Sequence, residues 1–181
     1  MKNLPKILIT PGEPSGIGYD ILLSIAEKKF PAQIIAITNL ELLKERANLL
    51  KKKINLINVD LHCNDLPSNT PGTILVHDIK THDKIEVGSP SIKHVPMILQ
   101  SLDIAINACM KKFAAAMVTG PVQKNIIMKF GANFSGHTEY IANQTGGMPI
   151  MMLHAQKLRV ALLTTHVPLV NVPKLITKDR I

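Results

Sequence analysis

Short runs of apolar, β-prone residues alternate with segments of helical period along most of the sequence, and this alternation restricts the fold more than any other feature. The runs predict strands at residues 6–10, 33–38, 54–59, 73–77 and 114–118. Strands that alternate with helices pair in parallel and form layered α/β folds. The sequence therefore predicts an α/β protein, with the last of these strands, which is rich in small residues, at the centre of the sheet.

Three helices are predicted between the strands. The first covers about residues 20–29, with Ile21, Leu22, Ile25 and Ala26 on one face. The second begins after Asn39, a residue type that caps helices well. In the longest, at about residues 91–112, apolar residues recur at steps of three and four. Pro96 fits this helix only in its first turn.

The pattern changes in the last third of the sequence. Two apolar runs, residues 149–153 and 158–164, are joined by a short polar link and predict a β-hairpin. We therefore expect a first α/β domain at residues 1–125 and the beginning of a second, substrate and metal domain at residues 126–181. Thr177 is a typical cap whose helix is missing, so we expect the chain to be truncated.

The net charge of +8 attracts anions, and both a phosphorylated metabolite and a nucleic acid would qualify. With no Trp, two Tyr and four Phe, the chain has little aromatic surface for stacking on bases. We therefore expect a small anionic ligand and no nucleic acid. No apolar run approaches the ~20 residues of a membrane span, and the start does not resemble a signal peptide. We expect a cytoplasmic protein that does not enter a membrane.

The first segment that could carry chemistry is T-P-G-E-P-S-G-I-G at residues 10–18, between a strand and a helix. Glycines there allow close backbone approach to a ligand, and the amides of a helix start favour an anion. The segment lacks the Gly-Lys-Ser/Thr of a P-loop and the three correctly spaced glycines of a dinucleotide fingerprint. A tight structural turn is therefore the alternative.

The second segment, V-T-G-P-V-Q-K at residues 118–124, follows a predicted strand. Ligands of open α/β sheets bind at the carboxyl ends of strands, so Lys124 is well placed to meet a phosphate or a substrate carboxylate. The alternative is a solvated lysine after a turn.

The third segment, F-S-G-H-T-E-Y at residues 134–140, crowds different polar groups into a loop that starts a helix. His137 can donate to or accept from a substrate oxygen and can shuttle a proton, and Thr138 adds a hydroxyl donor. The alternative is that Ser135 or Thr138 only caps the helix.

The fourth segment, L-T-T-H-V-P-L at residues 163–169, places His166 at the end of an apolar strand. Imidazole is the commonest protein metal ligand, although a lone histidine is more often a structural group. No nearby His, Cys or Asp supplies further ligands.

Taken in this order, the four segments resemble the patterns of the 4-hydroxythreonine-4-phosphate dehydrogenase family: T-P-G-E/D-P-A-G-I-G-P, T-G-P-x-x-K, G-H-T-E and T-T-H-x-P. The resemblance covers essentially the whole chain. It implies NAD-dependent oxidation and decarboxylation of 4-phosphooxy-L-threonine to 3-amino-2-oxopropyl phosphate in pyridoxal 5'-phosphate (vitamin B6) biosynthesis. It also implies a homodimer and a three-layer α/β/α fold like that of isocitrate and isopropylmalate dehydrogenases, incomplete in this chain.

The resemblance also implies roles for individual residues. His137 and Thr138 would bind the small phosphorylated hydroxy acid, and Lys124 would contact it or transfer a proton. His166 would be one ligand of a divalent cation such as Zn, Mg, Mn or Co, which polarises the reacting oxygen as a Lewis acid.

The cofactor implied by the resemblance is NAD or NADP. The loop at residues 10–18 is similar to the G-D-G-I-G-P loop of isopropylmalate dehydrogenases, which lies near the nicotinamide. The implied cofactor neighbours are therefore Gly16, Ile17 and Gly18. Tyr19 stands where the family has proline.

Family members are nearly twice as long as this chain, and their other metal histidines lie beyond its end. We therefore expect this chain alone to be inactive or nearly so. Two alternatives stay open: a dehydrogenase of the same family that acts on threonate 4-phosphate, and a non-catalytic remnant that keeps the sheet.

Overall fold

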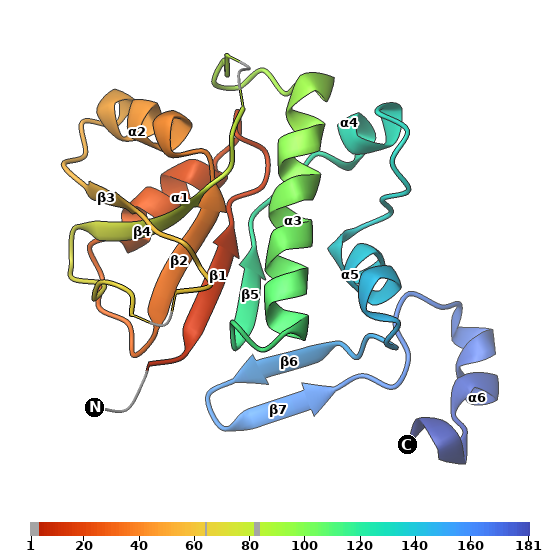
Figure 1. Ribbon diagram of the computed structural model, residues 1–181. Helices are drawn as coiled ribbons and strands as arrows, with labels where there is room; N and C mark the ends of the chain where they lie inside the picture. The colour runs from red at the N-terminus through yellow and green to blue at the C-terminus, as the bar shows by residue number, and fades with distance from the viewer. Residues whose placement is uncertain (1–3, 64, 82–83) are drawn as a thin grey trace. The chain divides into compact units, whose positions relative to one another are not determined.

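The computed structural model describes residues 4–63, 65–81 and 84–181. By contacts between Cα atoms the chain divides into two compact units, Met1–Thr145 and Gly146–Ile181. The first unit contains a five-stranded sheet, and the second contains a two-stranded one. The longest helix of the first unit lies beside β1 and β5 (Figure 1).

The first unit is built on a sheet with the strand order β3-β4-β2-β1-β5. Its strands are β1 (Lys6–Thr10), β2 (Gln33–Thr38), β3 (Asn55–Asn58), β4 (Thr73–Asp78) and β5 (Ala116–Thr119). Every neighbouring pair is parallel, and Leu8 in β1 stands between Ile35 of β2 and Met117 of β5. The predicted α/β fold with a parallel sheet is confirmed.

Helices follow the strands in the predicted alternation. They are α1 (Gly18–Ile25), α2 (Leu40–Leu49), α3 (Val95–Met110), α4 (Lys124–Lys129) and α5 (His137–Thr145), with the 3-10 turn η1 (Ile92–His94) before α3. The Asn39 side chain accepts a hydrogen bond of 2.9 Å from the Leu42 amide, so the predicted cap is confirmed. Pro96 lies in the first turn of α3, where its missing N–H costs nothing.

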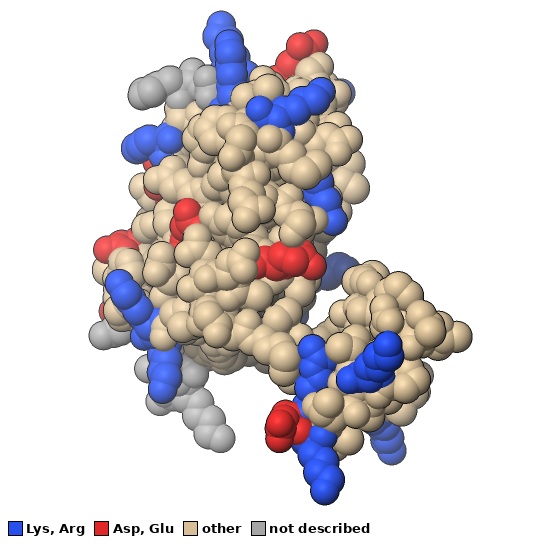
Figure 2. Space-filling model, turned by 90° about the vertical axis from the view of Figure 1, so that its right-hand side faces the viewer, with Lys and Arg blue, Asp and Glu red and all other residues tan. Residues whose placement is uncertain are grey.

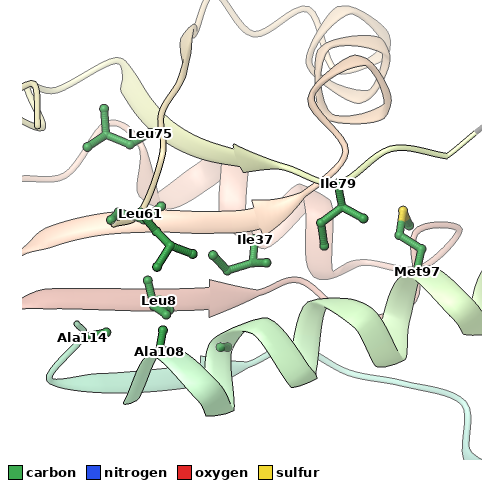
Figure 3. Packing of buried hydrophobic residues seen from close by; sticks show 10 residues of the cluster. Leu8, Ile37, Leu61, Leu75, Ile79, Met97, Ala108 and Ala114 are labelled. Carbon is green, nitrogen blue, oxygen red and sulfur yellow. The ribbon is translucent and has the colours of Figure 1, made fainter. Parts of the chain in front are cut away.

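The sheet buries both of its faces because alternate residues of a strand point to opposite sides. Ile35 and Ile37 pack with Leu8 and α3 on one face (Figure 3). Ala36, between them in β2, packs on the other face against α1 and α2. Strands buried on both sides read as continuous apolar runs, which is the pattern of β2 in the sequence.

Two sequence predictions are wrong in detail. Helix α1 begins at Gly18 rather than at residue 20. Of its predicted inner face Leu22 and Ala26 are buried, but Ile21 is exposed, and Tyr19 is buried in its place. Strand β5 pairs only with β1 among the described residues and therefore forms an edge of the sheet, not its centre. Ala116 and Val118 of β5 are exposed, which fits an edge position.

Helices α4 and α5 belong to the first unit by their packing. Ile127 of α4 and Phe134, in the connection between the two helices, are fully buried against Ile98 and Leu102 of α3. The Tyr140 hydroxyl donates a 2.6 Å hydrogen bond to Asp103, which ties α5 to α3. These contacts fix where α4 and α5 begin, and both beginnings carry candidate site residues.

The second unit contains the predicted hairpin, made by β6 (Met152–Ala155) and β7 (Leu158–Ala161). The two strands are antiparallel, and Gln156 in the two-residue turn has the positive φ of 50° that such turns require. After the hairpin come η2 (Leu169–Asn171), α6 (Val172–Leu175) and η3 (Lys178–Arg180). In the described part of the chain, no helix is both long and apolar enough to cross a membrane.

Candidate functional site

The loop Pro11–Gly18 and the turn after β5 are packed into each other. The Glu13 amide donates to the Pro121 carbonyl at 3.0 Å, and the Gly120 amide donates to the Thr10 carbonyl at 2.6 Å. A β-carbon at Gly18 or Gly120 would stand 1.8 or 2.2 Å from the Pro11 carbonyl oxygen. Gly120 is therefore required by the approach of the two loops to each other, and Gly18 by the way the Pro11–Gly18 loop folds back on its own start.

Arg46 of α2 holds the same loop from another side. Its guanidinium donates to the carbonyls of Pro14 at 2.8 Å and Gly16 at 3.0 Å and pairs with Asp20. The side chain is only 5% exposed. Arg46 was not predicted as a site residue, although its position one helical turn after the buried Leu43 is a signal that it faces inward.

Glu13 is a second buried charged group in the loop. Its Oε1 accepts hydrogen bonds from Ser15 Oγ at 2.8 Å and from His94 Nδ1 at 2.7 Å. All three residues are buried. Neither Glu13 nor His94 was predicted as a site residue, because 81 positions separate them in the sequence.

Ile17 is the residue of the loop that faces outward, with 64% of its surface exposed. It precedes α1 and makes no side-chain cap hydrogen bond, so the first amides of the helix are not capped by it. Exposed apolar surface beside helix amides suits the ring and the phosphates of a dinucleotide. Of the three predicted cofactor neighbours, Ile17 fits this role best, whereas Gly18 has the structural role described above.

Lys124 begins α4 and lies close to the beginning of α5. Its Nζ is 3.4 Å from the position that a β-carbon would take at Gly136, and Glu139 Oε2 is 2.7 Å from the same position. Lys124 itself is exposed. The structure therefore brings together two sequence-predicted segments, T-G-P-V-Q-K and G-H-T-E, around Gly136.

His137 is the first residue of α5, and its ring is partly buried. The ring stands edge-on to Phe134, with centroids 5.5 Å apart, and its Nε2 is buried without a hydrogen-bond partner among the described residues. Burial, and then the Lys124 ammonium, lowers the pKa of His137 from its ordinary value of 6.5. The imidazole is therefore neutral near pH 7, with a nitrogen left to bond a ligand atom.

Thr138, the second predicted substrate residue, is exposed in the first turn of α5. Glu139 follows it in the same turn, where a carboxylate is favoured by the helix dipole. The start of α5 therefore presents a hydroxyl, an imidazole and a carboxylate beside one lysine.

His166 lies in the second unit, outside the group described so far. It is exposed and has a φ of 54°, in the left-handed region that non-glycine residues rarely adopt. Such backbone conformations concentrate at functional sites. Within the described residues, however, no three His, Cys, Asp or Glu side chains gather as metal ligands, so the donor set of this chain alone does not make a metal centre.

These features define an α/β protein with a candidate ligand site beyond the carboxyl ends of the neighbouring strands β1 and β5. The sequence matches the family model described as "Pyridoxal phosphate biosynthetic protein PdxA" over residues 30–181. The chain belongs to this family, and the resemblance noted from the four segments is confirmed.

Curated relatives support the same assignment. A 4-hydroxythreonine-4-phosphate dehydrogenase of Pseudoalteromonas translucida is 44% identical over 97% of this chain and 53% of its own length. One of Methylococcus capsulatus is 38% identical over 98% of this chain and 53% of its own length. The chain thus spans about half the length of the curated relatives that it matches.

Solved structures share the fold. A 4-hydroxythreonine-4-phosphate dehydrogenase from Burkholderia phymatum superimposes with a TM-score of 0.89 at 23% identity, covering 99% of this chain and 55% of the other. One from Klebsiella pneumoniae gives 0.84 at 24% identity, covering 97% and 55%. At this level of identity the similarity establishes the fold alone.

Proposed function

We propose that this chain takes part in the NAD-dependent oxidation and decarboxylation of 4-phosphooxy-L-threonine to 3-amino-2-oxopropyl phosphate, a step of pyridoxal 5'-phosphate biosynthesis. The observation that carries the proposal is that the Lys124 ammonium lies beside the start of α5, where the Nε2 of His137 is buried without a hydrogen-bond partner among the described residues. Membership of the PdxA family and the names of the relatives support the choice of reaction and substrate.

The proposed roles follow from the charges of these groups. Lys124 offers an exposed ammonium that can pair with the phosphate or the carboxylate of the substrate. His137 is neutral and can donate a hydrogen bond to a substrate oxygen or accept one from a hydroxyl. Thr138 adds a hydroxyl at the same helix start. Lys124 is also the group that we propose for proton transfer, because its ammonium is close enough to His137 to lower the pKa of the imidazole.

The proposed cofactor is NAD or NADP, which supplies the hydride acceptor when bound. We place it beside Ile17, with Gly16 and Gly18 as the backbone on either side. The support is the exposure of Ile17 and its position at the start of α1, where it provides no side-chain cap. The packed loop around it would hold this surface in one shape before a ligand arrives.

His166 is proposed as one ligand of a divalent cation (Zn, Mg, Mn or Co), supported by its exposure and its unusual φ. Further ligands would have to join it for a complete centre, so no step is derived through the metal.

The larger architecture belongs to the same proposal. We propose a three-layer fold of the isocitrate/isopropylmalate dehydrogenase type, a homodimer and a cytoplasmic location. We also propose a domain boundary near residue 125, which differs from the division into compact units after Thr145. Helices on both faces of the sheet support the layered arrangement. The basic side chains stand apart on the face of the first unit drawn in Figure 2, which supports a small anion over a nucleic acid.

Isothermal titration calorimetry tests the substrate assignment directly. The purified chain is titrated with 4-phosphooxy-L-threonine, threonate 4-phosphate and inorganic phosphate, and NADH formation is followed in parallel with NAD and a divalent cation. We expect 4-phosphooxy-L-threonine to bind most tightly, and Lys124→Met or His137→Asn to weaken binding about tenfold or more. The controls are Lys129→Met and His154→Asn, which change an exposed lysine and an exposed histidine elsewhere. Equal binding by all five proteins would contradict the proposal.

A further inference from the structure

The buried carboxylate of Glu13 accepts its hydrogen bonds through one of its two oxygens. Oε1 accepts from His94 Nδ1 at 2.7 Å, from Ser15 Oγ at 2.8 Å and from the Ser15 amide at 3.2 Å. Oε2 is buried too and has no hydrogen-bond partner among the described residues. A buried carboxylate is unfavourable unless hydrogen bonds compensate it, so the position of Glu13 is set by Ser15 and His94.

The backbone of Glu13 joins the two candidate loops. Its amide donates to the Pro121 carbonyl at 3.0 Å, three residues before Lys124. Its carbonyl accepts from the Gly16 amide at 3.0 Å, immediately before Ile17. A shift of Glu13 would therefore move the start of α1 and the turn that leads to α4 together.

His94 reaches this junction from a third element. It is the last residue of η1, 4% exposed, and η1 packs against α4 as well as leading into α3. Its ring thus links the longest helix of the unit to the loop that Glu13 occupies.

We propose that Glu13 and His94 are a positioning pair that fixes the Pro11–Gly18 loop and the Thr119–Lys124 turn in one arrangement. The inference rests on the proposed function, because these two segments carry the residues proposed for the cofactor and the substrate. Both side chains are buried, so they act through Ile17 and Lys124 rather than by touching a ligand.

Two substitutions at position 94 separate the effect of the hydrogen bond to Glu13 from the effect of side-chain size. His94→Asn keeps an N–H donor near the place of Nδ1, whereas His94→Leu has a similar size and no donor. Amide hydrogen exchange of the 181-residue chain is measured for the two loops and for strands β2 and β4. We expect His94→Leu to speed exchange in both loops roughly tenfold and to leave the strands unchanged, and His94→Asn to stay within roughly threefold of the wild type.

Ser101→Ala is the matched control, because it removes another buried side-chain hydrogen bond, from Ser101 Oγ to the Ile98 carbonyl within α3. It should leave both loops unchanged. If His94→Leu does not fold, Ser15→Ala removes a weaker member of the same cluster and should speed both loops roughly threefold.

The positioning pair is refuted if the loops exchange as in the wild type, if only one loop responds, or if His94→Asn behaves like His94→Leu. Equal acceleration of the strands would also refute it, because it would indicate a general stabilising contact. The calorimetric titration separates this from the proposed function. If His94→Leu speeds exchange in both loops but the chain binds no phosphorylated acid, the positioning pair stands and the substrate assignment is overturned. If the chain binds 4-phosphooxy-L-threonine but the loops do not respond, the substrate assignment stands and the positioning pair is refuted.

Discussion

Gly12 and Pro121 lie so close together that a β-carbon at position 12 would stand 2.2 Å from the Pro121 carbonyl oxygen. Gly12 also has a φ of 81°, which disfavours any residue with a side chain. We expect Gly12→Ala to lower the free energy of unfolding by about 3 kcal/mol, from backbone strain and overpacking together. Denaturant unfolding measures this change.

Gly88 is the matched control, because its φ is also 81° and, apart from its chain neighbours, no atom of the described residues lies within 4 Å of the added β-carbon. Gly88→Ala should cost only the strain, about 1 kcal/mol. If the two variants lose the same stability, the close approach of the two loops is not as described.

Arg46 gives a prediction about the other side of the loop. Arg46→Met leaves the carbonyls of Pro14 and Gly16 and the Asp20 carboxylate without their donor. We expect a loss of about 3 kcal/mol in the free energy of unfolding, since one partner of a mostly buried ion pair is removed. Lys44→Met, on the exposed face of the same helix, should change stability by less than about 0.5 kcal/mol. A small effect at Arg46 would show that solvent replaces its hydrogen bonds.

Because Lys124 lies close to His137, removing its charge should change the pKa of the imidazole. Burial is the larger cause of the low pKa of His137, and the Lys124 ammonium adds to it. Lys124→Gln should therefore raise the pKa of His137 measured by NMR, but not to the ordinary value of 6.5. Lys129→Gln, at the far end of α4, should leave it unchanged. An unchanged pKa in Lys124→Gln would place the ammonium away from the ring.

Tyr19 predicts how stability depends on alkaline pH. Burial raises its pKa from 10.0 to about 12, even though the Thr38 hydroxyl lies 2.5 Å from the phenol oxygen. Because the folded pKa is the higher one, the stability gained from the neutral phenol is present below pH 10 and is lost between pH 10 and about 12. Over that interval the wild type should lose about 2.5 kcal/mol through this residue.

Tyr19→Phe removes this contribution and the hydrogen bond with Thr38, so it should cost about 1 kcal/mol at pH 7 and flatten the alkaline slope. Some slope should remain, because the pKa of Tyr140 is also raised to about 12, by burial and by Asp103. Urea unfolding at several pH values measures both effects. An alkaline slope equal to that of the wild type would contradict the burial of the Tyr19 phenol.

The parts of the fold that sequence predicted are those with a local signal. The apolar run of β2 and the cap at Asn39 were found because neighbours along the chain determine them. The edge position of β5 was not found, because it depends on which strand pairs with β1. Strand pairing depends on contacts between residues far apart in the sequence, and the composition of one strand does not determine its partner.

The candidate site likewise contains residues that a local sequence signal identified and residues that depend on distant partners. Lys124 and His137 were identified because each lies in a recognisable segment, and the structure adds that both lie next to Gly136. The partners of Arg46 and of His94 were missed, because they lie 26 or more positions away and include backbone carbonyls that carry no residue type. Buried polar groups of this kind are found only when the packing is known.

In the proposed function, the unpartnered Nε2 of His137 receives a phosphorylated hydroxy acid held by Lys124. Nitrogen NMR of the imidazole at pH 7.5, recorded while 4-phosphooxy-L-threonine is added, tests it directly. We predict a saturable shift of the Nε2 resonance in the wild type and a much weaker one in Lys124→Met, with the resonance of His154 unmoved. A His137 resonance that stays fixed while calorimetry reports binding would place the substrate elsewhere and contradict the account.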